Sequence, residues 1–180
     1  DRTSVDIDME VLASAQTANL YMRTDFAAQG IAGAADGVLV STVTLEIAGP
    51  DGVVELTFVS GATNVDIINA INSRSGVTGI TATSGGTVGG NAASGIVFQS
   101  VAYGSESFVS VKKLSGGNVL QTGRIANDGP GPINWGTNSV SGDRDAGRDV
   151  VVLLNGAVAT GRGLQVTTRN PELDLQVILE

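Results

Sequence analysis

The side chains that most often perform chemistry in proteins are histidine and cysteine, and this sequence of 180 residues contains neither. The chain therefore has no imidazole base, no thiolate nucleophile and no disulfide. Metal sites built from histidine or cysteine are excluded, and so is a Ser-His-Asp arrangement. Carboxylates, a glycine-rich segment and a few aromatic residues remain as candidates for a functional site.

One group of carboxylates surrounds Gly147, where Asp143, Asp145 and Asp149 are spaced in a way that resembles a calcium-binding loop. Arg144 and Arg148 interrupt this loop, and no glutamate follows at the position that would close it. We therefore favour a turn in which arginine and aspartate pair locally, and we predict no metal ligand here.

A second group consists of Asp6, Asp8 and Glu10, which alternate with Val5, Ile7, Met9 and Val11. Alternation with a period of two predicts a half-buried strand whose acidic side chains share one face. These carboxylates could hold a cation, but we favour a solvated acidic face that discourages pairing between sheet edges.

Glycine-rich and aromatic segments complete the candidates. Residues 84–95 could cradle a phosphate, yet they lack the lysine and the following helix that such a loop needs. Trp135 and Tyr103 could stack on a sugar, although a single tryptophan in a Pro/Gly-rich loop more often fixes that loop to the core. We predict no catalytic, cofactor-binding or metal-binding residue, no cofactor, and no enzymatic activity.

Composition narrows the classes of partner. The formal net charge is −8 and the pI is about 4.4. An acidic surface repels phosphate backbones and anionic lipids, so we expect neither nucleic acid nor a membrane as a partner. Aromatic residues make up 4% of the chain and glycine accounts for 25 residues. These values favour a thin aliphatic core in a β protein with many turns.

The clearest local pattern is a hairpin followed by a helix. Strands are expected at 40–48 and 53–59, joined through Pro50 and through a positive φ at Gly52. A helix is expected at 64–74, capped by Thr63 or Asn64 and ended by Gly76. Its apolar stripe consists of Ile67, Ile68 and Ile71, which should cover one face of the hairpin.

The rest of the chain consists mostly of strand patterns. A short helical turn is expected near Asp25–Gln29, and residues 127–148 read as a long excursion that covers a sheet edge. Asn155-Gly156 is a strong signal for a two-residue hairpin turn. Further strands are expected at 5–11, 18–23, 96–101, 108–114, 150–154, 157–160, 164–168 and 173–179.

These patterns predict a mainly β fold with a minor α component: antiparallel sheets, one short helix packed on a hairpin, and two small subdomains. Residues 38–114 would form one subdomain. Residues 1–37 and 115–180 would form the other, from the N-terminal strands and the C-terminal hairpins.

The order of elements in 38–114, including the pair Ile71-Asn72, resembles the IN-type β-β-α-β insert in the outer domains of bacterial flagellins. Residues 145–156 and 161–164 are similar to strands that close the outer part of some flagellins. This sequence has no long heptad-patterned helices of the kind that build a filament core, so the resemblance implies an excised outer-domain fragment.

The resemblance implies a structural subunit of the bacterial flagellar filament, extracellular and involved in motility, whose partners are neighbouring subunits. It also implies O-linked glycan on exposed serine or threonine, at positions that the sequence does not identify. One alternative is a domain of the filament cap or of a hook-associated protein. An alternative from another class is a secreted β module that binds glycan or a host surface, for which Trp135 would have to be exposed.

Overall fold

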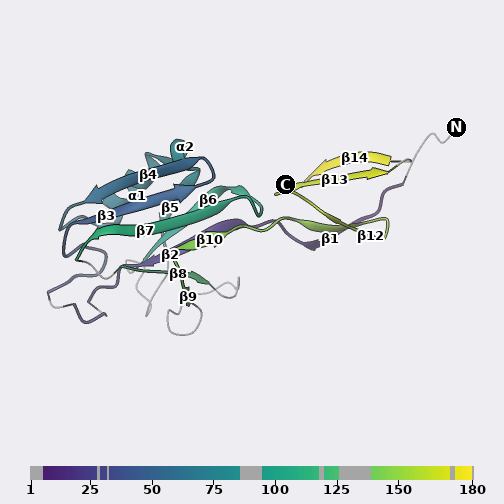
Figure 1. Cartoon of the computed structure of the whole chain (residues 1–180). Helices are drawn as coiled ribbons and strands as arrows, with labels where there is room; N and C mark the ends of the chain where they lie inside the picture. Colours follow the sequence, from purple (N-terminus) through teal and green to yellow (C-terminus); the bar gives the residue numbers. More distant parts are fainter. Residues whose placement is uncertain are drawn as a thin grey trace.

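The computed structural model describes residues 6–27, 29–31, 33–85, 95–117, 120–125, 139–170 and 173–179. The molecule is elongated and consists of a large β module and a small β module (Figure 1). The chain begins in the small module, passes through the large module from β2 (Thr17–Arg23) to β10 (Arg144–Ala146), and returns. The described strands pair antiparallel and helix is a minor component, so the predicted fold class is confirmed.

Two antiparallel sheets form the large module, with strand orders β10-β7-β3-β4 and β5-β6-β2-β8-β9. Strands β8 and β9 were not expected from the sequence, and β10 lies in the excursion predicted for 127–148. Part of that excursion does cover a sheet edge, because β10 pairs with β7. The remaining strands of the two sheets are β3 (Val43–Gly49), β4 (Gly52–Phe58), β5 (Ile80–Ser84), β6 (Gly95–Tyr103), β7 (Phe108–Gly116), β8 (Gln121–Ile125) and β9 (Ser139–Ser141).

A single aliphatic core joins these sheets. On β3, Val43, Leu45 and Ile47 are buried while the residues between them are partly exposed, which is the alternation expected for a strand with one inward face. The same cluster contains inward-facing residues of both sheets and of the helix that follows the hairpin, among them Leu20, Met22, Ile67, Ile71, Ile80, Ile96, Phe98, Val109 and Val111. Burial of this aliphatic surface is the main stabilising contribution to the module.

The hairpin of β3 and β4 is confirmed, with Gly49 paired to Gly52 across Pro50 and Asp51. The positive φ predicted at Gly52 is wrong, because Gly52 is not among the residues with a left-handed backbone. Glycine is required at position 52 because of its small size. A Cβ atom there would lie 2.8 Å from the carbonyl oxygen of Val77, so glycine permits close packing against the helical segment.

The predicted single helix is two helices, α1 (Asn64–Asn72) and α2 (Ser75–Thr78). Thr63 caps α1 as expected, in a reciprocal arrangement with Asp66. The prediction that Gly76 ends the helix is wrong, since Gly76 lies inside α2. The left-handed residue at the end is Gly79, with φ of 70°. The backbone thus makes one more turn before β5, which places α2 beside β3 and β4.

The small module has a sheet of order β1-β11-β12 and a separate hairpin of β13 and β14. The predicted turn at Asn155-Gly156 is confirmed, with φ of 47° and 81°. The strands are β1 (Met9–Ala13), β11 (Val151–Leu154), β12 (Ala157–Thr160), β13 (Gln165–Asn170) and β14 (Leu173–Ile178).

The prediction of a half-buried strand near the N-terminus is wrong for the described residues. Every residue of β1 is exposed. The small core consists of Ala15, Val150, Val152, Leu154 and Val166. None of these residues belongs to β1, whereas Val152 and Leu154 lie on β11 and Val166 lies on β13.

The division into 38–114 and 1–37 plus 115–180 stays a prediction. The strand pairing adds that β2 hydrogen-bonds to β6 and β10 to β7, both strands of the segment that starts at 38, and that β8 joins the same sheet through β2. β1 and β11–β14 pair among themselves. Residues 86–94 and 126–138 lie outside the described residues. Most of the predicted glycine-rich loop and Trp135 are therefore not placed.

Replacing Ile71 should test the contribution of α1 to the large core. Ile71 is 1% exposed, whereas Val65 on the same helix is 63% exposed. We expect Ile71→Ala to lower the free energy of unfolding by about 2 to 5 kcal/mol through lost burial and a cavity. Val65→Ala should change it by less than about 0.5 kcal/mol. Denaturant titration of both variants measures this, and equal effects would show that α1 does not depend on the core.

Candidate functional site

The three aspartates around Gly147 make contacts with different parts of the molecule. Asp145 accepts a hydrogen bond from the backbone N–H of Asn19 at 2.8 Å, while the backbone carbonyl of Asp143 accepts from Val111 at 2.9 Å. Asp149 points to a different part of the molecule. Across the part of the chain that the structure describes, no three acidic residues gather closely enough to hold a metal ion.

Asp149 instead lies at the junction between the two modules. Its Oδ1 accepts hydrogen bonds from the backbone N–H of Ser105 at 3.0 Å and of Gly163 at 2.7 Å, and its Oδ2 accepts from the Ser105 hydroxyl. Ser105 belongs to the turn between β6 and β7 of the large module, and Gly163 precedes β13 of the small module. One carboxylate therefore connects the two modules.

The backbone at this junction is closely packed. Gln16 and Arg148 exchange two backbone hydrogen bonds, of 2.8 and 3.0 Å, and Gly104 donates to the carbonyl of Gln16 at 3.1 Å. Gly104 has φ of 102°, and a Cβ atom there would lie 2.6 Å from Oδ1 of Asp149. Only glycine fits at this position, both for its backbone conformation and for the space available.

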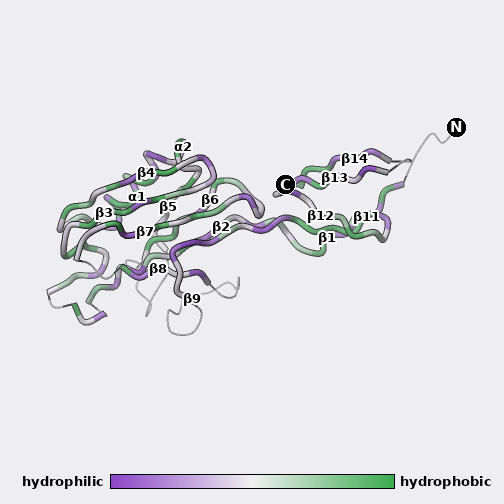
Figure 2. Tube along the Cα trace, in the orientation of Figure 1, coloured by the Kyte–Doolittle hydropathy of each residue, from purple (hydrophilic) through white to green (hydrophobic). Residues whose placement is uncertain are grey.

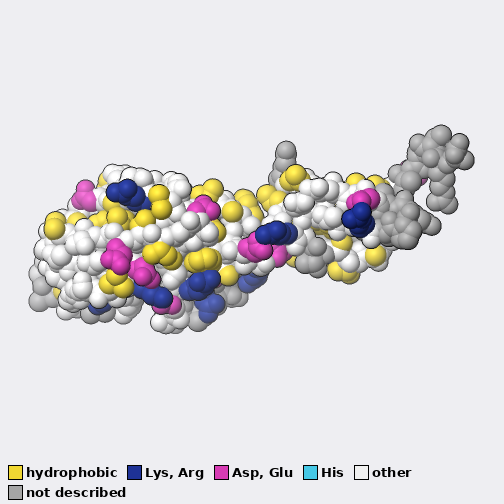
Figure 3. Space-filling model, turned by 45° about the horizontal axis from the view of Figure 1, so that its top comes forward, with side chains coloured by type: hydrophobic (Ala, Val, Ile, Leu, Met, Phe, Trp, Pro, Cys, Tyr) yellow, Lys and Arg dark blue, Asp and Glu magenta, His cyan; other side chains and the backbone are white. Residues whose placement is uncertain are grey.

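Hydrogen bonding at the junction favours the ionised form of Asp149. Its hydrogen bonds, first from the Ser105 hydroxyl and then from the Gly163 N–H, lower the pKa of the carboxyl below its usual value. Arg162 nearby makes a small contribution in the same direction and forms an ion pair with Glu106. Both side chains of that pair are largely exposed, so the pair itself adds little stability. Basic and acidic side chains lie together where the molecule narrows (Figure 3).

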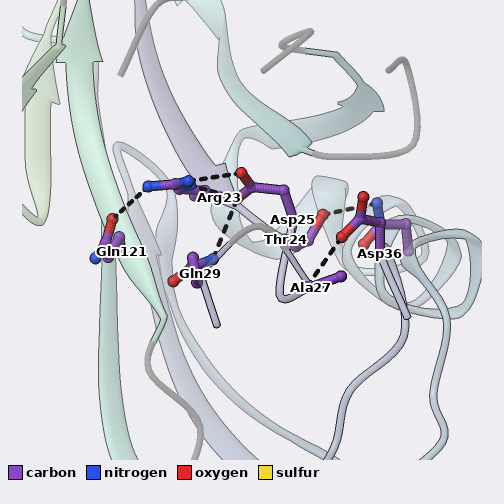
Figure 4. Close-up of polar contacts among 8 residues, drawn as sticks. Arg23, Thr24, Asp25, Ala27, Gln29, Asp36 and Gln121 are labelled. Atoms are coloured by element: carbon purple, nitrogen blue, oxygen red, sulfur yellow. Dashed lines mark hydrogen bonds and ion pairs between the residues drawn. The ribbon is translucent and has the colours of Figure 1, made fainter. Parts of the chain in front are cut away.

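A second polar cluster lies at the other end of β2 (Figure 4). Arg23 makes a two-bond contact with Asp25, whose side chain is almost fully buried, and Gln29 donates to Asp25 at 3.1 Å. The backbone N–H of Gln29 also donates to the carbonyl of Asp25, which confirms the predicted helical turn. Because Arg23 and Gln29 occupy both carboxylate oxygens, the cluster fixes the loop after β2 and provides no reactive group.

The remaining candidates are not brought together. Tyr103 is 48% exposed at the end of β6 and lines an apolar pocket of about 300 Å³ with Val11 and Leu164. Trp135 lies outside the described residues, so a sugar-binding platform stays a prediction. Asp6, Asp8 and Glu10 are exposed. In the described part of the chain, no helix is long and apolar enough to span a membrane.

Residues 42–100 match the family model described as the flagellin hook IN motif. This segment carries the flagellin IN motif. It begins one residue before β3 and ends within β6, so it contains the hairpin, both helices and β5. The resemblance expected from the sequence is confirmed as a flagellin-like outer domain.

The structure explains the Ile-Asn pair within the IN motif. Ile71 is buried in the large core. Asn72 donates to the carbonyl of Ala82 at 3.0 Å and accepts from the N–H of Ala82 at 2.7 Å. The isoleucine thus anchors α1 in the core while the asparagine connects the end of α1 to β5. The sequence analysis predicted that Ile71 packs in the core, but it did not predict the hydrogen bonds of Asn72 to β5. The only indication in the sequence was that Asn72 directly follows Ile71.

Several solved structures share the fold. The flagellar cap protein FliD from Bdellovibrio bacteriovorus matches with a TM-score of 0.57 and 13% identity over 99% of this chain and 95% of that chain. The D2-D3 domains of FliD from Escherichia coli match with a TM-score of 0.58 and 13% identity over 100% and 86%. FliD (HAP2) from Pseudomonas aeruginosa matches with a TM-score of 0.54 and 17% identity over 99% and 82%. No curated protein sequence matches the chain.

Replacing Asp149 should loosen the connection between the modules. We expect Asp149→Asn to leave both cores folded but to broaden the range of module orientations, because one amide cannot accept all three hydrogen bonds. Since the chain has no cysteine, cysteines introduced at Val53 and Val158 can carry a fluorescent pair that reports the distance between modules. Asp174→Asn, at an exposed acid of the small module, is the matched control. An unchanged distance distribution in Asp149→Asn would contradict this role.

Acid should affect the same connection in a defined pH range. The pKa of Asp149 is lowered in the folded chain from an ordinary value of 3.8, so its stabilisation is fully present above that value and is lost as the pH falls through the lower, folded pKa. We expect the fluorescence distance distribution to stay constant from pH 7 to about pH 5 and to broaden below about pH 4. Asp149→Asn should remove the pH step. The pKa of Asp66 is also lowered, by hydrogen bonds from Thr63. This cap lies within the large module, so its titration should not change the measured distance between the two modules.

Proposed function

We propose that the chain is the outer part of a flagellar cap protein and has a structural function. The observation that carries this proposal is the extent of the shared fold. The FliD proteins from Bdellovibrio bacteriovorus and Escherichia coli match 99% and 100% of this chain, so the likeness includes the small module as well as the IN motif. An isolated IN motif inserted in an unrelated domain would match only part of the large module.

The second candidate is the one expected first from the sequence, an outer domain of the flagellin that forms the filament. The IN motif at residues 42–100 supports it, since the motif is named after flagellin. Because the insert is expected in flagellins, in hook-associated proteins and in the cap protein, it does not discriminate between them. The cap is favoured because the FliD likeness extends over both modules.

A structural function agrees with what the residues offer. The hydrogen bonds of Asp149, Arg23 and Asp25 fix the backbone, and each of the carboxylates has its oxygens occupied. The proposal places the chain outside the cell at the flagellum, where its partners are other flagellar subunits. Its contribution is to hold an elongated, acidic body at a fixed orientation relative to the rest of the assembly.

Immunogold electron microscopy of intact flagella distinguishes the candidates. Antibodies raised against this chain should label the filament tip alone if it belongs to a cap protein. Labelling along the whole filament would contradict the cap assignment and support flagellin, and labelling at the junction between hook and filament would support a hook-associated protein. Antibody adsorbed on an excess of the purified chain is the control for specific labelling.

A further inference from the structure

The first strand of the small module has an unpaired edge in the part of the chain that the structure describes. β1 pairs with β11 on one side, and the sheet order places no described strand on its other side. The trace around β1 is coloured hydrophobic over much of its length (Figure 2). Exposed apolar edges of this kind are available for pairing with another strand.

Hydrogen bonds at Asp8 define which backbone groups face that edge. The N–H of Asp8 donates to the side-chain oxygen of Asn155 at 2.8 Å, and its carbonyl accepts from the N–H of Asn155 at 2.9 Å. Both groups of Asp8 therefore point toward the β11–β12 hairpin. Because these directions alternate along an antiparallel strand, the N–H and carbonyl groups of Met9 and Val11 point away from β11.

The side chains divide by face. Ile7, Met9 and Val11 are 42%, 36% and 46% exposed and lie on one face. Asp8 and Glu10 are exposed on the opposite face. Neither carboxylate has an ion-pair partner among the described residues. The edge thus offers unpaired backbone groups, an aliphatic row and an uncompensated negative row.

We propose that the β1 edge binds an extended peptide segment in which aliphatic residues alternate with lysine or arginine. Such a segment would add a fourth strand to the sheet, as in other cases of β-strand addition. Its aliphatic side chains would lie beside Ile7, Met9 and Val11, and its basic side chains beside Asp8 and Glu10. Opposite charges on directly facing strand residues stabilise pairing.

A second copy of this chain is a poorer occupant for the same edge. If two β1 strands paired antiparallel about a two-fold axis perpendicular to the sheet, each face would meet its own kind. Asp8 and Glu10 of one copy would then lie opposite the acids of the other copy, which destabilises the pair. The acidic row therefore selects against self-pairing and in favour of a basic segment.

A peptide titration tests this proposal on the intact chain. The probe is a seven-residue peptide of alternating lysine and valine, blocked at both ends, added to isotope-labelled protein at neutral pH and low salt. We expect amide shift changes centred on Met9 and Val11, and weaker binding as salt is raised. A peptide in which glutamate replaces lysine should bind at least about tenfold more weakly, because like charges then face each other.

Variants separate the two components of recognition. Glu10→Lys should weaken binding about tenfold. Glu55→Lys, at an exposed acid on edge strand β4 of the large module, should leave it unchanged. Met9→Pro removes an outward N–H without removing a bond to β11 and should abolish binding. If that variant misfolds, a lysine/valine peptide N-methylated on alternate backbone nitrogens, added to the unaltered protein, tests the same hydrogen bonds.

Three outcomes would overturn the proposal. One is the absence of binding by the lysine/valine peptide. Another is shift changes that map away from β1, for example onto β4. The third is concentration-dependent dimerisation of the peptide-free chain, seen by sedimentation and removed by Met9→Pro, which would identify a second copy as the occupant.

Discussion

The relation between the two modules depends on the carboxylate of Asp149. The segment between β10 and β11 supplies the acceptor, the turn after β6 supplies Ser105, and the segment before β13 supplies Gly163. Three segments far apart in the sequence are thus held at one point. Gly104 allows this contact because any side chain there would displace the carboxylate or the backbone of Gly163. A few polar contacts and a close backbone approach therefore help to set the module orientation.

This arrangement matters more for the small module than for the large one. The large core combines two sheets and a helix, whereas the small core contains five buried residues within the described part of the chain, of which one is alanine. A core of that size buries little apolar surface, and small units of this kind depend on additional constraints. The junction supplies them at β11 and β13, the strands that contribute most of the small core. The contacts at the junction therefore contribute both to the orientation of the small module and to its stability.

Patterns in the sequence predicted correctly those structural features that are determined by neighbouring residues. The alternation on β3, the Thr63 cap of α1 and the Asn155-Gly156 turn are each determined by neighbouring residues, and each was confirmed. Predictions were wrong where the conformation or burial of a residue depends on contacts with residues far away in the sequence. Gly52 was given a positive φ because its packing against Val77 was invisible, and β1 was expected to be half-buried because its alternating pattern does not say whether a second layer lies above it. For Asp149, the pattern of nearby acids suggested a local loop, although its partners lie 44 and 14 residues away.

The acidic residues on β1 and its exposed aliphatic residues are related, because the acids can prevent the open edge from pairing with other copies of the chain. A subunit displayed on the outside of an assembly, as proposed for this chain, is present at high local concentration with its copies aligned, and aligned copies with open strand edges tend to pair. Covering β1 with a second layer would need a larger core than the small module has. Placing Asp8 and Glu10 on the strand costs less, because charges of like sign prevent the pairing of copies and leave the backbone groups free. Asp8 and Glu10 disfavour pairing of β1 with a second copy of the chain, and the same two charges favour pairing with a basic strand.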